Sequence, residues 1–159
     1  MSELSRNLDL FRDLCPQELR RIEALSETRT HKPGDVIMRQ GFPADAIYLI
    51  DHGAVRVTAI LAENDADTAR SDEEVLVQLG AGEFFGEISF ITGKPPGLSV
   101  IAEQETQVTV LPHAPLHALL AEDAAICKKL LFAITRTLVG RLGSTGRELV
   151  LARYFIRTS

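Results

Sequence analysis

The spacing of hydrophobic positions changes twice along this chain. After Pro16, a residue that suits a first helical turn, apolar side chains recur at helical spacing at Leu19, Ile22 and Leu25. Between residues 36 and 112 the apolar period falls to two, and beyond that it returns to 3.6. The pattern predicts two short N-terminal helices, a β-rich centre and helices at the C-terminal end.

The centre consists of short runs rich in β-branched residues, which are VIMRQG, AIYLIDHG, VRVTAIL, EVLVQLGAG, LSVIAE and TQVTVLP. Turn-forming residues separate these runs, namely Pro33, Gly34, Gly41, Gly53, Gly80, Gly82 and Gly93. Short strands with turn signals about every ten residues are typical of a sandwich or a barrel. The predicted fold class is therefore mainly β, with flanking helices.

Two helices are predicted after the strands, a short one over PHAPLHALLAED and a long one over residues 124–157. The long helix carries an apolar stripe at i, i+4 spacing, formed by Ile126, Leu130, Ile134, Leu138 and Leu142. A helix of this length cannot bury its whole stripe on a small barrel. Leu149, Ala152 and Ile156 extend the stripe, and we expect the far half of the helix to pair with a second copy, which gives a homodimer through this helix.

Three glycines interrupt the long helix at every third position, at Gly140, Gly143 and Gly146. Each glycine costs about 1 kcal/mol relative to alanine in a helix interior. Together they favour a close approach of another helix or a ligand, with a break near residue 143 as the alternative interpretation.

Composition and charge narrow the functional classes. The 159 residues are 45% hydrophobic and 25% charged, which is ordinary for one globular domain. Seventeen basic against 22 acidic residues give a net charge of −5, which is no footprint for nucleic acid or an anionic membrane. No run is long and apolar enough for a membrane span, and the N-terminus lacks a signal layout. Cys15 and Cys127 show no metal-type spacing, so the expected setting is a reducing cytoplasm without a bound metal.

Charge is nevertheless uneven along the chain. The segment AENDADTARSDEE carries a net charge of −5, and residues 128–157 carry +6. The acidic segment is either a solvated hairpin loop or a docking segment for a basic partner. No helix-turn-helix follows before Ser159, so no DNA-binding domain is expected in this chain, which could also be a fragment of a larger regulator.

The segment LGAGEFFGEISF has the composition of an anion-binding turn. Its glycines allow close backbone approach, and a helical turn over residues 87–91 would direct free N–H groups at one spot. Glu87 would repel a phosphate but suits a sugar hydroxyl; the alternative is a tight turn in which Glu87 caps the helix. His113 and His117 have an i, i+4 spacing without a third metal ligand nearby, and no catalytic motif is evident, so we do not expect an enzyme.

The order of these segments resembles the cyclic nucleotide-binding domain family, which includes catabolite-activator-type regulators and kinase regulatory subunits. The segments that carry the resemblance are LFRDLCPQELRRI, HKPGDVIMRQGFPADAIYLIDHGAVRV and GEFFGEISFITGKPPGLSVIA. The resemblance implies a double-stranded β-helix jelly roll. It divides the chain into N-terminal helices (1–30), a jelly roll (31–112) and C-terminal helices (113–159).

The resemblance also implies a ligand, cyclic AMP or cyclic GMP, and a set of binding residues. Glu87 would contact the ribose 2′-hydroxyl, and the backbone from Gly86 to Ser89 would surround the phosphate. The full predicted set is Phe85, Gly86, Glu87, Ile88, Ser89, Lys94, Gly97, Leu98 and Ser99.

One residue departs from the family pattern. Where relatives carry an arginine that grips the cyclic phosphate, this chain has Pro96. Removing one partner of a buried charge pair typically costs about 2–5 kcal/mol of binding free energy. Lys94 could replace the charge, although a lysine at a loop tip is usually solvated.

The sequence therefore indicates two candidate functions. The first is a stand-alone sensor that binds a cyclic nucleotide weakly and signals through its C-terminal helix to an unknown protein partner. The alternative is a ligand-free, degenerate module that acts as a dimeric scaffold.

Overall fold

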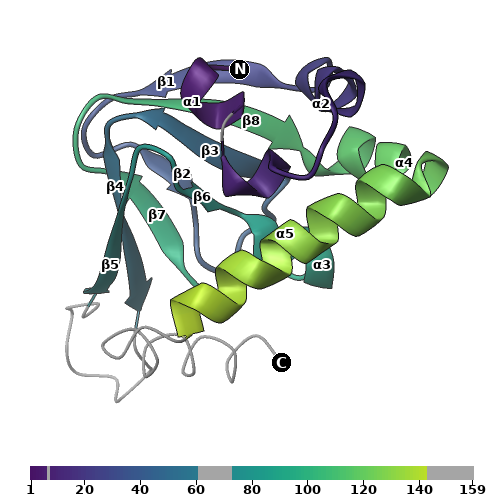
Figure 1. Ribbon diagram of the computed structural model, residues 1–159. Coiled ribbons are helices and arrows are strands. Elements are labelled where there is room, and N and C mark those ends of the chain that lie inside the picture. The colour runs from purple at the N-terminus through teal and green to yellow at the C-terminus, as the bar shows by residue number, and fades with distance from the viewer. Residues whose placement is uncertain (7, 61–72, 143–159) are drawn as a thin grey trace.

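The computed structural model describes residues 1–6, 8–60 and 73–142 of the chain (Figure 1). The acidic segment between residues 62 and 74 therefore lies almost wholly outside the described residues. So do Gly143, Gly146, Leu149, Ala152, Ile156 and the basic residues beyond position 142.

Within these residues the strands form two four-stranded antiparallel sheets, in the orders β1-β8-β3-β6 and β2-β7-β4-β5. The strands are β1 (Glu27–His31), β2 (Val36–Met38), β3 (Ala46–His52), β4 (Ala54–Ile60), β5 (Glu73–Gly80), β6 (Phe84–Phe85), β7 (Ser99–Ala102) and β8 (Thr106–Pro112). The two sheets face each other as a jelly roll, which confirms the predicted fold class.

Strand β3 is buried on both faces, which explains its unbroken apolar run. Ala46, Tyr48 and Ile50 face the space between the sheets, where they join one hydrophobic cluster. Ile47 and Leu49 point the other way, into a second cluster formed with the helices. A strand buried on both faces reads as a continuous hydrophobic segment rather than as an alternating one.

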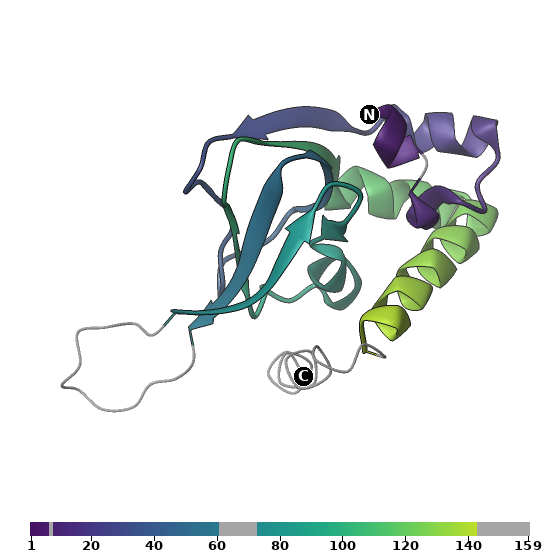
Figure 2. The same cartoon turned by 60° about the vertical axis from the view of Figure 1, so that its left-hand side comes forward.

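The helices gather on the outer face of the β3 sheet (Figure 2). They are α1 (Glu3–Arg6), the 3₁₀ turn η1 (Asp9–Phe11), α2 (Pro16–Glu23), α3 (Glu87–Thr92), α4 (His113–Glu122) and α5 (Ala124–Leu142). The predicted boundary of the N-terminal helices at residue 30 is too late, because β1 already begins at Glu27. The segment ETRTH gives no apolar signal because β1 is an exposed edge strand that pairs with β8.

The structure corrects the predicted dimer seam. Ile126, Leu130 and Ile134 are fully buried inside the monomer, against η1 and α4, so they are not available to a second copy. Leu138 is partly buried, and the side chain of Leu142 lies outside the described part of the structure. Gly140 is exposed, and a Cβ added there would meet no atom within 4 Å, so it marks no close approach within the monomer.

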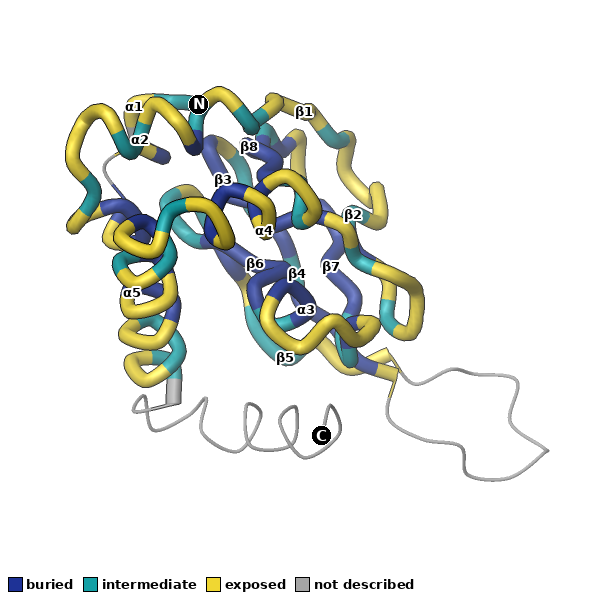
Figure 3. Tube along the Cα trace, turned by 90° about the vertical axis from the view of Figure 1, so that its right-hand side faces the viewer, coloured by how far each residue is buried: buried dark blue, intermediate teal, exposed yellow. Residues whose placement is uncertain are grey.

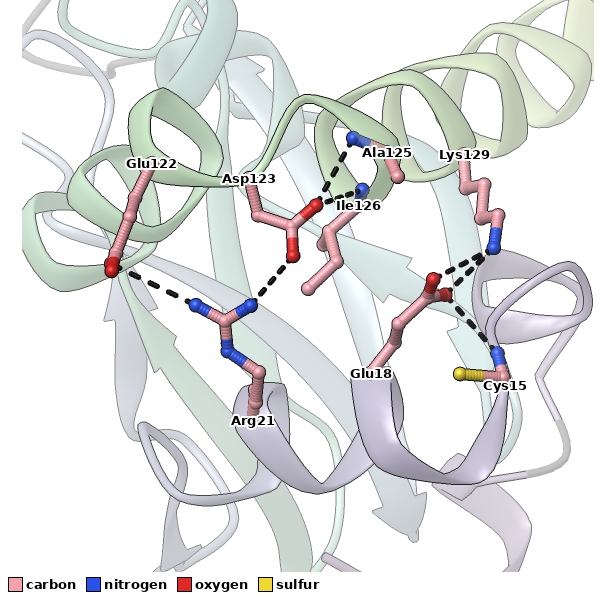
Figure 4. Close-up of polar contacts among 8 residues, drawn as sticks. All are labelled: Cys15, Glu18, Arg21, Glu122, Asp123, Ala125, Ile126 and Lys129. Atoms are coloured by element: carbon pink, nitrogen blue, oxygen red, sulfur yellow. Dashed lines mark hydrogen bonds and ion pairs between the residues drawn. The ribbon is translucent and has the colours of Figure 1, made fainter.

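Polar contacts fasten the N-terminal helices to the start of α5 (Figure 4). Asp123 accepts the backbone N–H groups of Ala125 and Ile126, both at 3.1 Å, as an N-cap does. Its other carboxylate oxygen accepts a hydrogen bond from Arg21 of α2 at 2.6 Å. Lys129 donates to both oxygens of Glu18, at 2.8 and 2.9 Å. The first turns of α5 are therefore fixed to α2 by directional bonds as well as by packing.

Candidate ligand site

A cavity of about 80 Å³ lies in the barrel interior. Strands, the turn before α3 and helix α5 all contribute to its wall. The lining residues are Met38, Val57, Leu76, Val77, Leu79, Phe85, Gly86, Glu87, Ile88, Ser89, Leu98, Val100, Leu138 and Arg141. The wall is mostly apolar, with Glu87 and Arg141 as its charged members.

The turn into α3 depends on a glycine. Gly86 precedes the helix with φ of 88°, a left-handed conformation that other residues rarely adopt. A Cβ at this position would lie 2.4 Å from the backbone oxygen of Ala46. The turn therefore packs directly on β3, and this contact places the next residue, Glu87, at the cavity.

Glu87 is a buried carboxylate, with 4% of its surface exposed. Its Oε1 accepts a hydrogen bond from Nη1 of Arg141 at 3.2 Å. Burial raises the pKa of Glu87 above its ordinary value, although the Arg141 guanidinium and a backbone N–H act in the opposite direction. The charged form of Glu87 therefore depends on its partner from α5.

Arg141 reaches the cavity from the last turn of α5. Its Nη2 donates to the backbone oxygen of Phe84 at 2.8 Å, and its guanidinium lies 5.1 Å from the centre of the Phe84 ring. Only 17% of its side chain is exposed. One side chain thus connects the end of α5 to both the rim and the carboxylate of the cavity.

The structure brings most of the predicted binding residues together. Phe85, Gly86, Glu87, Ile88, Ser89 and Leu98 all line the cavity.

Three predicted residues do not line the cavity, namely Lys94, Gly97 and Ser99. Lys94 is exposed on the loop after α3 and is not among the residues that line the cavity. The hydroxyl of Ser99 accepts the backbone N–H of Gln40 at 2.9 Å instead. Pro96, which stands where relatives carry an arginine, is buried, and its carbonyl accepts the N–H of Gly41 at 2.9 Å. This bond anchors the loop at that position.

Sequence reasoning missed Arg141 as a site residue. Ile134, Leu138 and Arg141 follow one another at helical spacing, so Arg141 continues the apolar stripe with a charge. A cation on a buried helix face needs an acceptor, and that was the available signal. The other basic residues nearby obscured it.

The profile of the family described as "Cyclic nucleotide-binding domain" matches residues 28–123, which is more than half of the chain. The chain belongs to the cyclic nucleotide-binding domain family. The solved structure of a cyclic nucleotide-binding domain from Methylobacillus flagellatus has the same fold, with a TM-score of 0.76 and 24% identity, and covers 95% of this chain and 80% of that one. Domains of this family are typically regulatory rather than catalytic.

Two sequence relatives are much longer than this chain. A Rhodopseudomonas palustris protein described as a potassium channel protein is 32% identical over 142 residues, which are 89% of this chain and 31% of the relative. A cAMP-dependent protein kinase regulatory subunit of Hypocrea atroviridis is 31% identical over 102 residues, 64% of this chain and 20% of the relative. The chain therefore spans less than a third of either relative.

The described residues contain neither a membrane span nor a cluster of metal ligands. None of the described helices is long and apolar enough to cross a membrane. No group of three or more histidine, cysteine, aspartate or glutamate side chains comes together there as a metal site would require.

Proposed function

We propose that this cyclic nucleotide-binding domain is a cytoplasmic, non-catalytic sensor that binds a cyclic nucleotide weakly in the cavity. In this proposal Glu87 takes the ribose 2′-hydroxyl, and the backbone from Gly86 to Ser89 lies around the phosphate. The output is a change in the position of the end of α5, read by a partner protein.

One observation carries the proposal, namely the contact of Arg141 with Glu87. The carboxylate that would hold the ribose is the same group that holds the end of α5. A ligand hydroxyl that bonds to Glu87 must share it with Arg141 or displace it. Occupancy of the cavity and attachment of the helix are therefore coupled through one carboxylate group.

Two features support weak rather than tight binding. Pro96 supplies no cation for a phosphate, and the cavity of about 80 Å³ is smaller than the roughly 300–1,000 Å³ of ordinary small-molecule sites. A nucleotide therefore enters only when the wall formed by Leu138 and Arg141 moves outward.

Calorimetric titration with cyclic AMP and then cyclic GMP tests the proposal. We expect the wild-type protein to bind at least one of them at high micromolar to millimolar concentration. Pro96→Arg should tighten binding by about 30-fold or more, since a buried charge pair is worth about 2–5 kcal/mol. Glu87→Ala should weaken it.

Pro95→Arg is the matched control, because it adds the same charge at the neighbouring position, which is exposed where Pro96 is buried. Equal gains from both variants would indicate general charge attraction instead of a rebuilt clamp. No binding by the wild type or by Pro96→Arg, from protein shown to be folded, would contradict the sensor proposal.

The second candidate function is a ligand-free dimeric scaffold. A different face of α5 favours it, because Phe132 and Val139 are 59% and 61% exposed, and Leu131 beside them is also exposed. Exposed apolar side chains on one helix face can pair with a second copy. This face replaces the buried stripe as the expected seam.

Sedimentation tests the scaffold directly. Phe132→Glu should convert a dimer into monomers, while Lys128→Glu, on the exposed surface one turn earlier, should not. A monomeric wild-type protein would contradict the scaffold proposal and leave the sensor proposal unaffected.

A further inference from the structure

Two histidines of α4 contact helix α3 through the ring of Phe90. The His117 ring stacks on Phe90 of α3, with ring centres 4.1 Å apart and an angle of 21° between the planes. The His113 ring lies 5.3 Å from the same phenylalanine, tilted by 53°. Phe90 is buried, so these contacts belong to the packed interface between α3 and α4.

His113 makes one contact that His117 does not make. Its Nε2 lies 3.2 Å from the backbone oxygen of Gly86, the glycine of the cavity turn. The same carbonyl accepts the N–H of Phe90 at 3.3 Å, beyond the usual range of about 2.7–3.2 Å for such bonds. The imidazole is therefore the closer of the two partners of this carbonyl.

The position of His113 is itself fixed by the backbone. Its N–H donates to the carbonyl of Asp45 at 2.7 Å, just before β3 begins. On its other side the Gly86 turn packs on the Ala46 carbonyl, also in β3. The turn is thus held between strand β3 and the His113 ring.

Peptide geometry carries this contact into the cavity. The Gly86–Glu87 peptide is planar and trans, so the Gly86 carbonyl and the Glu87 N–H point in opposite directions. A glycine has many accessible conformations, and its peptide plane turns freely unless a neighbour holds it. When His113 holds the Gly86 carbonyl, the orientation of the Gly86–Glu87 peptide is fixed. The direction in which the Glu87 side chain projects from the backbone is then fixed as well.

We propose that His113 is a positioning residue of the cavity, which holds the Gly86–Glu87 peptide through its bond to the Gly86 carbonyl and so orients the Glu87 carboxylate. The consequence for ligand affinity rests on the proposed function, whereas the consequence for the turn does not.

The surroundings of His113 determine when it titrates. Burial lowers the pKa of His113, and His117 acts in the same direction, while the Gly86 and Ala44 carbonyls and Asp45 raise it. The ring is therefore neutral at neutral pH and becomes charged only on acidification. A charged imidazole donates a stronger hydrogen bond, so its protonation should shift the electron density of the Gly86 carbonyl. Glu87 belongs to the same turn, and its pKa is raised. The titration of Glu87 must therefore be separated from that of His113.

Nuclear magnetic resonance of the full chain tests the positioning role without a ligand. The carbonyl carbon of Gly86 and the ring nitrogens of His113 are followed from about pH 8 to about pH 4, across the range in which histidine titrates. We expect both to share one midpoint, in the wild type and in Glu87→Gln, where the carboxylate no longer titrates. That midpoint should disappear from the Gly86 signal in His113→Gln and persist in His117→Gln, the control on the same helix.

A Gly86 signal that ignores the His113 midpoint, or that keeps it in His113→Gln, overturns the proposal. His113→Gln also preserves a donor, because its side-chain amide N–H can reach a carbonyl acceptor. His113→Leu does not.

Titration with cyclic AMP supplies the second test. His113→Leu should weaken binding by about five- to tenfold, the value of one hydrogen bond of about 1–1.5 kcal/mol, and His113→Gln should restore most of it. His117→Leu should bind as the wild type does. If His113→Leu binds equally well, the proposed role in the site is wrong while the sensor function stands. If neither the wild type nor Pro96→Arg binds cyclic AMP or cyclic GMP, the sensor function fails, and the resonance experiment still decides the role of His113.

Discussion

The two halves of helix α5 are held in different ways. The first half, from residue 124 to 134, places Ile126, Leu130 and Ile134 in the core with no exposed surface. Buried and exposed positions alternate along α5 in Figure 3. Lys129 adds its two bonds to Glu18 of α2. This half belongs structurally to the N-terminal helices.

The second half, from residue 135 to 142, has no buried side chain within the described residues, and its ion pair between Arg136 and Asp13 is exposed. Leu138 is partly buried and Val139 is largely exposed, so the polar link of Arg141 to Glu87 and Phe84 makes up much of the contact with the barrel. The first half of α5 is thus an anchored segment. The second half is an arm whose attachment to the barrel depends on contacts at the cavity. A ligand at Glu87 would act on the arm and leave the anchor in place.

The largest expected difference between the halves is in packing energy. Leu130→Ala should lower the free energy of unfolding by about 2–5 kcal/mol, the usual cost of deleting a buried leucine side chain. Leu138→Ala should cost less than about 1.5 kcal/mol, because each buried methylene contributes only about 0.8 kcal/mol and this side chain is partly exposed. Urea unfolding of both variants measures the difference, and equal costs would contradict the division of the helix.

The next effect concerns the bonds of Arg141, which attach the second half of α5 to the barrel. Arg141→Met leaves the Glu87 carboxylate buried without its cation, and we expect a loss of about 1–3 kcal/mol in the free energy of unfolding at neutral pH. Arg136→Met is the matched control, because it removes an ion pair between Arg136 and Asp13 whose two side chains are about 40% exposed. That variant should unfold at the wild-type urea concentration.

Hydrogen exchange then shows which half the Arg141 link holds. In Arg141→Met the amides of residues 135–142 should exchange faster, and those of residues 126–134 should keep their protection. Faster exchange along the whole helix would mean that the two halves act as one unit.

A smaller effect should appear as pH dependence. Because burial raises the pKa of Glu87 above the ordinary 4.5, the folded protein holds this proton more tightly than the unfolded chain does. Wild-type stability should therefore fall as pH rises from about 4.5 through the folded pKa. Glu87→Gln has no proton to lose, so its stability relative to the wild type should rise over that window and then level off.

Glu18 of α2, the partner of Lys129 in the anchored half, provides the opposite slope. The hydrogen bond from Lys129 lowers the pKa of Glu18, so its contribution is present above the ordinary value and is lost as pH falls. Urea midpoints of Glu87→Gln and Glu18→Gln at several pH values compare the two. Slopes of the same sign would contradict this difference between the halves.

The smallest expected effect is that of Lys129→Met. Its ion pair with Glu18 is partly exposed, with 34% of the Lys129 side chain and 17% of the Glu18 side chain accessible, and such pairs contribute about 0.2–1 kcal/mol to stability. We expect a small lowering of the urea midpoint, and a loss as large as that of Leu130→Ala would show that the anchor depends on this bond as much as on packing.

Much of the fold could be predicted from apolar spacing. The change from period two to 3.6 marks the boundary between β8 and α4, and the turn before α3 follows from its glycines. Strand β1 could not be predicted, because an edge strand of sequence ETRTH has no face that requires apolar residues. The stripe on α5 indicated burial correctly, but spacing alone does not say whether the covering surface belongs to the same chain.

The site was predictable as far as its residues are contiguous. The turn from Phe85 to Ser89 forms the cavity wall as expected, since glycine and the residues around it act locally. Arg141 is far away in the sequence, and its partnership with Glu87 depends on where α5 crosses the barrel. Lys94 lies only two residues before Pro96 in the sequence, so it was a candidate to replace the family arginine. In the structure it is exposed and does not line the cavity.

Strand β3 separates two hydrophobic compartments, and this has a consequence for how such a domain changes during evolution. Tyr48 and Ile50 face the barrel interior, and Ile47 and Leu49 face the helices, so a substitution on one face leaves the packing on the other intact. Mutations can accumulate in the compartment between the sheets without removing the helical layer. Ligand preference can therefore diverge in one small domain while its architecture is conserved. A single strand separates the residues that are under these two selective constraints.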